Sequence, residues 1–185
     1  SVQGGDWRGR YSIIGLAPDL VFCIVDGRAE LSDGGFEDAD FRAMPEAPLD
    51  AFRRVVAESA AHIPHGLPPP SAGLFGYLSY DMVRYVENLP GTAPDPLDLP
   101  EALMVRPTIV AVFDNVASEI TFVTVARPNA AGDAYDAATR RLERAVEALE
   151  ARLPATRPLG DAPREQPTPV SNTTPEAYRA TVEKC

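Results

Sequence analysis

The chain has 185 residues, enough for one domain or two small ones with a buried core. Apolar residues make up 45% of it and charged residues 24%, as in ordinary globular proteins, and no apolar run is long enough to span a membrane. A net charge of -10 repels phosphate backbones, which argues against nucleic-acid binding.

Cysteine use and the N-terminal residues point to a compartment. Cys23 stands in an apolar run and is predicted to be a small core residue. Together with the distant Cys185 it forms neither a disulfide framework nor a zinc site. No signal peptide is visible at the start of the chain. We therefore expect a soluble protein of a reducing compartment, the cytoplasm.

The first part of the chain predicts strands followed by one helix. Strands rich in β-branched and aromatic residues are expected at 10–15, 20–26 and 28–32, with Asp26-Gly27 as a hairpin turn. Residues 34–45 are acidic and irregular and are expected to form a loop. A helix is expected over 48–63. Its apolar positions follow the helical period at Leu49, Phe52, Val56, Ala60 and Ile63.

The rest of the chain continues this pattern. In order, we expect a strand at 72–80, a short helix or turn at 81–87, a loop at 88–100, a hairpin of strands 108–114 and 119–126, and a helix at 134–153 with Tyr135, Leu142, Val146, Leu149 and Leu153 on one face. Strands come mostly as hairpins, and no alternation of strand and helix is sustained. This favours an α+β fold, an antiparallel β-sheet with packed helices.

A further helix is predicted to begin near the last residues. Thr173 and Glu176 have the spacing of a capping box, and Pro175 suits the first helical turn. An apolar face follows at Tyr178, Val182 and Cys185. Because this face has no partner and the helix has no C-terminal cap, we expect the chain to be part of a longer protein. A natural, fraying terminal helix is the alternative.

Side chains suited to catalysis are few. His62 and His65 stand at the end of the first predicted helix, where a capping role is favoured over catalysis. The carboxylates Asp81, Glu87 and Asp114 stand near strand ends. A structural capping role and a role in acid–base catalysis explain them equally well. The sequence contains no nucleophile elbow, zinc-protease motif or Walker loop.

Residues 73–90 form the most specific pattern. They combine glycines and aromatic residues with a D-x-x-R-x-x-E run, in which Asp81 and Arg84 can pair if the turn is helical. The segment resembles the G-x-x-G-Y-x-x-Y-D-x-V-R-x-x-E-x-L-P motif of the anthranilate synthase component I family. Further segments of that family are matched in the same order at residues 8–15, 113–114 and 171–184.

The resemblance implies a lyase that converts chorismate and ammonia to anthranilate and pyruvate in tryptophan biosynthesis. It also implies a glutamine amidotransferase subunit that supplies ammonia, magnesium (Mg2+) that holds the chorismate carboxylate, and feedback inhibition by L-tryptophan. It assigns residues 1–153 to the N-terminal regulatory domain, 154–171 to a linker and 172–185 to the start of a truncated catalytic domain. Catalytic and metal residues would lie outside this chain, which alone would be inactive.

Part of a tryptophan site is implied at the beginning of the chain. Ser1 matches the serine of the family's L-L-E-S motif, and its hydroxyl suits the amino or carboxylate group of the inhibitor. Arg10 is the nearest match to a basic residue on the following strand and suits the carboxylate. Tyr11 and Ser12 are further candidates. The alternatives are a disordered terminus for Ser1 and a surface charge for Arg10.

Two other functions stay open. Aminodeoxychorismate synthase component I shares the architecture but makes a folate precursor, and the run from Tyr80 to Tyr85 with Glu87 favours anthranilate synthase over it. A stand-alone amino-acid-binding module is the second alternative. The helix predicted at 174–185 argues against that module.

Overall fold

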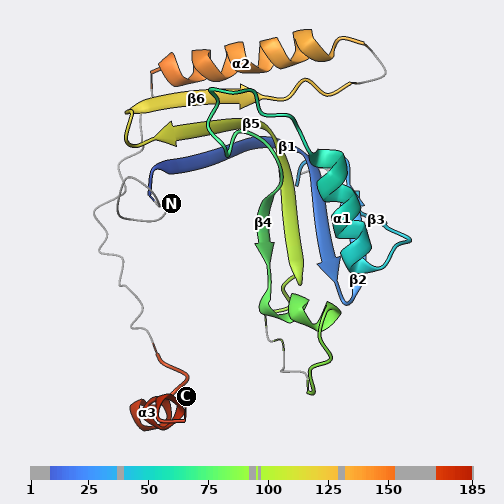
Figure 1. Cartoon of the computed structure of the whole chain (residues 1–185), viewed down its shortest axis with the longest axis vertical. Coiled ribbons are helices and arrows are strands. Elements are labelled where there is room, and N and C mark those ends of the chain that lie inside the picture. Colours follow the sequence, from blue (N-terminus) through green and yellow to red (C-terminus); the bar gives the residue numbers. More distant parts are fainter. Residues whose placement is uncertain are drawn as a thin grey trace. The chain divides into compact units, whose positions relative to one another are not determined.

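The computed structural model in Figure 1 describes residues 9–36, 40–91, 95, 97–128, 132–152 and 170–184. The chain divides into two compact units, residues 1–151 and 152–185. The first unit contains a six-stranded antiparallel sheet with helices packed on it, and the described part of the second contains one helix. The predicted α+β fold is confirmed, whereas the predicted domain and linker boundaries stay a prediction.

The elements follow one another along the chain as β1 (Tyr11–Val25), β2 (Arg28–Ser32), β3 (Arg42–Ala43), α1 (Pro48–Ser59), β4 (Phe75–Leu78), the 3₁₀ helix η1 (Tyr80–Tyr85), β5 (Ala102–Asp114), β6 (Glu119–Thr124), α2 (Ala134–Glu150) and α3 (Pro175–Val182). The strand order is β3-β2-β1-β5-β4, and β6 also pairs with β5. The β1–β2 turn is the predicted one, because Asp26 and Gly27 both have positive φ angles, as a tight hairpin turn requires.

Two long strands, β1 and β5, replace the shorter strands that were predicted. The segments expected at 10–15 and 20–26 form one strand with a register shift between Pro18 and Leu20, and β5 begins at Ala102 instead of 108. Pro18 lies opposite Pro107, and neither proline has an N–H to donate. The prolines therefore interrupt the ladder locally without ending either strand.

The outer edge of β5 is shared by two partners. Residues 102–105 pair with β4, and residues 109–114 pair with β6. Between them, residues 106–108 pair with neither strand. Figure 1 shows β4 and β6 along different stretches of β5, with α2 beside β6 and α1 against the β1–β2 side. The division of the sheet at 106–108 positions one of the two cavities described below.

The core lies between the second half of β1 and α1. Phe22 and Ile24 are fully buried against Ala51 and Val55 of α1, and the Phe22 and Phe52 ring centroids are 5.9 Å apart. The predicted face of α1 is confirmed in part, because Leu49 and Phe52 are partly buried and pack against the core. Ala51, Val55 and Ser59 are its buried residues, whereas Val56 is exposed. The helix ends at Ser59, so Ala60 and Ile63 of the predicted apolar face are not helical.

Helices α2 and α3 bury little. Of α2 only Ala138 is buried, and this helix packs mainly on β6. Tyr135, Val146 and Leu149 of the predicted face are exposed, and Leu153 falls outside the described residues. In α3 the cap is Thr174 rather than the predicted Thr173, since its hydroxyl accepts from the Ala177 N–H at 3.2 Å. The predicted loop at 34–45 contains the two-residue β3, which extends the sheet beside β2.

Candidate functional site

The predicted tryptophan residues that the structure describes lie at the start of β1. Ser1 is outside the described residues. The Arg10 guanidinium donates to both carboxylate oxygens of Asp114, from Nη2 at 2.7 Å and from Nε at 3.0 and 3.1 Å. It also lies 5.1 Å from the centre of the Tyr11 ring. Arg10 is therefore ordered by an ion pair and a ring, and no residue in the described ranges accepts from its Nη1.

Asp114 ends β5 and is held by more than one partner. The Arg10 guanidinium, followed by the backbone N–H groups of Ala117 and Val116, lowers the pKa of the Asp114 carboxyl to about 2. Its side chain is 11% exposed. Because it accepts from these backbone N–H groups, Asp114 has the structural capping role, which was predicted alongside a role in acid–base catalysis. A ligand carboxylate that binds Arg10 through Nη1 would share the guanidinium with Asp114.

An apolar cavity of about 420 Å³ lies on the same stretch of β1. It is lined by Ile13, Gly15, Pro18, Phe36, Phe75, Val105 and Pro107. The two-residue period of a strand places Tyr11 on the face that carries Ile13 and Gly15. Ser12 belongs to the opposite face, where its hydroxyl accepts from Asn115 Nδ2 at 3.4 Å. The structure thus brings Arg10 and Tyr11 together but separates Ser12 from Tyr11.

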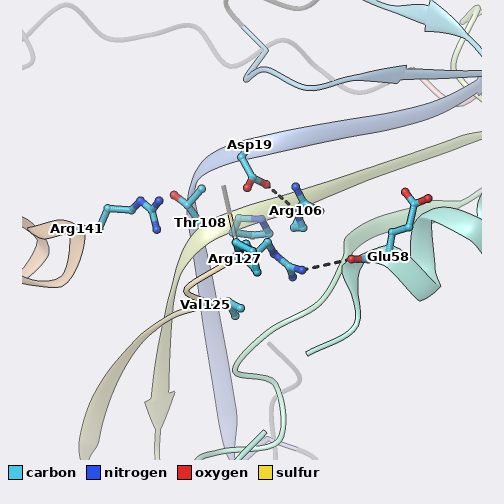
Figure 2. Close-up of a pocket in the computed structure, with 9 residues that line it drawn as sticks. Asp19, Glu58, Arg106, Thr108, Val125, Arg127 and Arg141 are labelled. Carbon is cyan, nitrogen blue, oxygen red and sulfur yellow. Dashed lines mark hydrogen bonds and ion pairs between the residues drawn. The ribbon is translucent and has the colours of Figure 1, made fainter. Parts of the chain in front are cut away.

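A second cavity, of about 480 Å³, is shown in Figure 2 and lies where β4 and β6 part along β5. It is lined by Asp19, Glu58, Arg106, Pro107, Thr108, Val125, Arg127, Pro128 and Arg141. This cavity was not predicted from the sequence, because its arginines come from β5, from the segment after β6 and from α2. Nothing in their local spacing indicates that they meet.

Each of the three arginines is fixed by the protein. Arg106 Nε donates to Asp19 Oδ1 at 2.7 Å, and Arg141 Nη1 donates to Thr124 Oγ1 at 3.2 Å. Arg127 donates to the backbone oxygens of Ser59 at 2.8 Å and Glu58 at 3.3 Å, the last carbonyls of α1. Burial, and then the nearby positive charge of Arg106, lower the pKa of Arg127.

The Arg127 contact corrects the role predicted for the histidines. His62 and His65 lie beyond the end of α1, and both are exposed. A cation does cap this helix, as the helix dipole favours, but it comes from residue 127. The histidines were predicted because they follow the helix directly in the sequence, whereas Arg127 is far from it along the chain.

The motif at 73–90 contains β4 and η1, and its side chains anchor η1 to neighbouring segments. Arg84 Nε donates to Asp81 Oδ1 at 2.7 Å, which confirms the predicted pair. The Tyr85 hydroxyl donates to Glu101 Oε2, which also accepts from the Gly27 N–H at 3.3 Å. Burial and the Glu101 carboxylate raise the pKa of Tyr85. The motif therefore ties η1 to the start of β5 and to the β1–β2 turn.

Within the described ranges, no group of three or more histidine, cysteine, aspartate and glutamate side chains is placed to hold a metal ion. In the same part of the chain, no helix combines the length and apolar character that crossing a bilayer requires. Cys23 is buried, as predicted, and burial followed by the Glu30 charge raises the pKa of its thiol to about 11.

Comparison with known proteins matches residues 14–185 to the family described as chorismate binding enzyme. Anthranilate synthase component 1 of Cereibacter sphaeroides is 43% identical over 188 residues, covering 100% of this chain and 37% of that protein. The Pseudomonas aeruginosa protein of the same name is 40% identical over 152 residues, covering 80% of this chain and 30% of that protein. The chain thus spans about a third of the length of these curated relatives.

One solved structure also resembles the chain. The crystal structure of anthranilate synthase component I from Streptococcus pneumoniae TIGR4 matches with a TM-score of 0.62 at 20% identity. The match covers 83% of this chain and 32% of that one. At this level of identity the likeness shows a shared fold.

Proposed function

The chain belongs to the chorismate binding enzyme family, and from this membership we propose that it is the regulatory part of an anthranilate synthase component I. The observation that carries the proposal is the 43% identity to the Cereibacter sphaeroides anthranilate synthase component 1, which extends over the whole of this chain. The motif at 73–90 also supports it, because that segment resembles the motif of the anthranilate synthase component I family.

The proposed reaction of the complete protein converts chorismate and ammonia to anthranilate, pyruvate and water, as a lyase of tryptophan biosynthesis in the cytoplasm. A glutamine amidotransferase partner would release the ammonia from glutamine. Magnesium would hold the chorismate carboxylate on residues that this chain does not supply. The role of the 185 residues would be to bind L-tryptophan and inhibit this reaction.

The geometry at the start of β1 supports a tryptophan site. The apolar cavity lined by Ile13, Phe36 and Phe75 offers space for an indole ring. Arg10 carries Nη1 donors that no described side chain uses, which suit the ligand carboxylate. Ser1 would contact the amino or carboxylate group. Tyr11 shares the strand face of the cavity, whereas Ser12 would act from the opposite face.

Product analysis of the complete protein tests the reaction. With chorismate and ammonia, we expect anthranilate, detected by its fluorescence after chromatography. Formation of 4-amino-4-deoxychorismate instead would identify an aminodeoxychorismate synthase component I. The 185-residue chain alone is expected to leave chorismate unchanged, and anthranilate formation by this chain would contradict the regulatory role.

Inhibition assays on the complete protein test the site. Ser1→Arg is expected to relieve tryptophan inhibition while turnover without inhibitor stays the same. Arg10→Gln is expected to weaken inhibition by about tenfold or more, the worth of one charge-assisted hydrogen bond. Arg28→Gln, an exposed arginine of β2, is the control and should not change inhibition. An unchanged inhibition constant in Ser1→Arg or Arg10→Gln would remove that residue from the site.

A further inference from the structure

The cavity in Figure 2 gathers positive charge from three separate elements of an acidic protein. Arg106, Arg127 and Arg141 line it in a chain whose net charge is -10. Figure 2 shows the Arg141 side chain extending toward Thr108, with Arg106 and Arg127 beyond that residue. Because like charges repel, such a gathering is unfavourable unless something negative offsets it.

The carboxylates that line this cavity neutralise its arginines only in part. Asp19 pairs with Arg106 at 2.7 Å. The Glu58 carboxylate pairs instead with Arg54, at 3.7 Å, and Arg54 is not among the lining residues. Glu58 offers Arg127 only its backbone oxygen. Among the described residues, no carboxylate lies within ion-pair distance of Arg127 or Arg141, and the Asp19 charge acts on Arg127 only from beyond that distance. Three arginines against two carboxylates leave the lining with an excess of positive charge.

The guanidiniums are also held in place before any ligand arrives. Arg127 is anchored on the end of α1, Arg141 on Thr124, and Arg106 on Asp19. Each anchor uses only one or two N–H donors of its guanidinium, so each arginine keeps donors for a ligand. The Arg106 side chain is only 17% exposed, which strengthens its electrostatic interactions relative to bulk water. Fixed, partly desolvated arginines lose little entropy when they bind an anion.

The size and lining of the cavity indicate the class of ligand. Its volume of about 480 Å³ exceeds that of a bare phosphate ion and lies within the usual range of small-molecule pockets, roughly 300–1,000 Å³. Pro107, Val125 and Pro128 add apolar surface that suits a short carbon body. We propose that this cavity binds a small organic dianion, a phosphomonoester or a dicarboxylate, with Arg127 and Arg141 on its charged groups and Arg106 beside them.

Isothermal titration calorimetry tests the proposal directly. The protein is titrated with glycerol 3-phosphate and with succinate at constant ionic strength, and acetate serves as the monoanion control. We expect saturable binding of at least one dianion and none of acetate in the same range. The tighter of the two dianions identifies the anionic group that the cavity prefers.

Variants of α2 assign the binding to this cavity. Arg141→Gln is expected to weaken binding by about tenfold or more, because it removes a charge-assisted contact. Arg144→Gln changes the same charge on an exposed position of the same helix and should bind as the unaltered protein does. If Arg141→Gln lowers the urea midpoint of unfolding, Arg141→Lys replaces it, and the loss of the planar fork should still weaken binding several-fold.

The absence of saturable binding by either dianion would overturn the proposal. Equal weakening in Arg141→Gln and Arg144→Gln would also overturn it, because the effect would then follow net charge rather than this cavity. Unchanged affinity in the folded Arg141 variants would do the same. None of these outcomes bears on the family assignment or on the tryptophan site.

Discussion

Gly76, the second glycine of the motif at 73–90, lies against the backbone of β5. A Cβ atom added to Gly76 would lie 1.9 Å from the Leu103 oxygen and 2.9 Å from the Leu103 carbonyl carbon and the Met104 Cα. Since a carbon and a carbonyl oxygen in close contact are about 3.3 Å apart, Gly76→Ala requires β4 and β5 to separate locally by about 1.4 Å. A backbone carbonyl in a paired strand cannot rotate away as a side chain can.

The cost follows from what such a displacement breaks. Strands normally lie about 4.8 Å apart, so the nearest β4–β5 hydrogen bonds would stretch beyond bonding distance. The loss of two such bonds, about 1 kcal/mol each, adds to an overpacking cost of about 1–3 kcal/mol. Alanine lowers the conformational entropy of the unfolded chain, which offsets about 0.5–1 kcal/mol of this cost. We expect a net destabilisation of about 2–4 kcal/mol.

Urea unfolding followed by circular dichroism measures this effect. The midpoint of Gly76→Ala should fall clearly while the slope stays the same, and the melting temperature should fall by about 5–10 °C. The matched control is Gly35→Ala, whose added Cβ would lie at an ordinary 3.5 Å from the Pro18 oxygen. That variant should stay within about 0.5 kcal/mol of the unaltered protein. A Gly76→Ala midpoint equal to that of Gly35→Ala would show that β4 does not pair with β5 in this register.

Three further predictions concern the ion pair, the thiol and the core. The Asp114 pKa of about 2 lies below the ordinary value of about 4, so the stabilisation from its pair with Arg10 is present above about pH 4 and is lost as pH falls through about 2. Asp114→Asn should therefore lower the urea midpoint at pH 7, and the difference should shrink on acidification; a pH-independent difference would contradict the ion pair. In a Cys185→Ser variant, Cys23 should resist a disulfide reagent at pH 8 and react quickly in urea, because burial raises the pKa of its thiol to about 11; fast reaction of the native protein would show that Cys23 is accessible. Phe22→Ala should destabilise the protein by about 3–5 kcal/mol in the same urea assay, since Phe22 is fully buried and packs against Phe52; a loss below about 1 kcal/mol would place Phe22 outside the core.

Several features of the fold could be predicted because they depend on residues close together in the chain. The Asp26-Gly27 turn follows from the ability of these residues to adopt positive φ angles. The pair of Asp81 and Arg84 follows from a spacing of three residues in a helical turn. The α+β class follows from hairpin spacing along the whole chain.

Other features depend on partners far away in the sequence and were predicted wrongly or missed. Residues 16–19 were expected to separate two strands, but pairing with β5 carries β1 through them. The histidines were expected to cap α1, yet the cap comes from Arg127, which lies in the segment after β6 in the chain. The predicted face of α1 holds at Leu49 and Phe52, which pack against the core, whereas Val56 is exposed. Ala60 and Ile63 lie beyond the helix, because the apolar pattern does not show that it ends at Ser59.

The sequence by itself determined the α+β class, the hairpin turn, the buried cysteine and the resemblance to the anthranilate synthase component I family. These depend on local conformational preference, on hydrophobic pattern and on motif order, which follow from the order of the residues in the sequence. Only the tertiary structure decided that Arg10 forms an ion pair with Asp114 and that Arg106, Arg127 and Arg141 surround one cavity. Charges from distant segments meet only after the sheet has paired, and their electrostatic environment depends on that meeting.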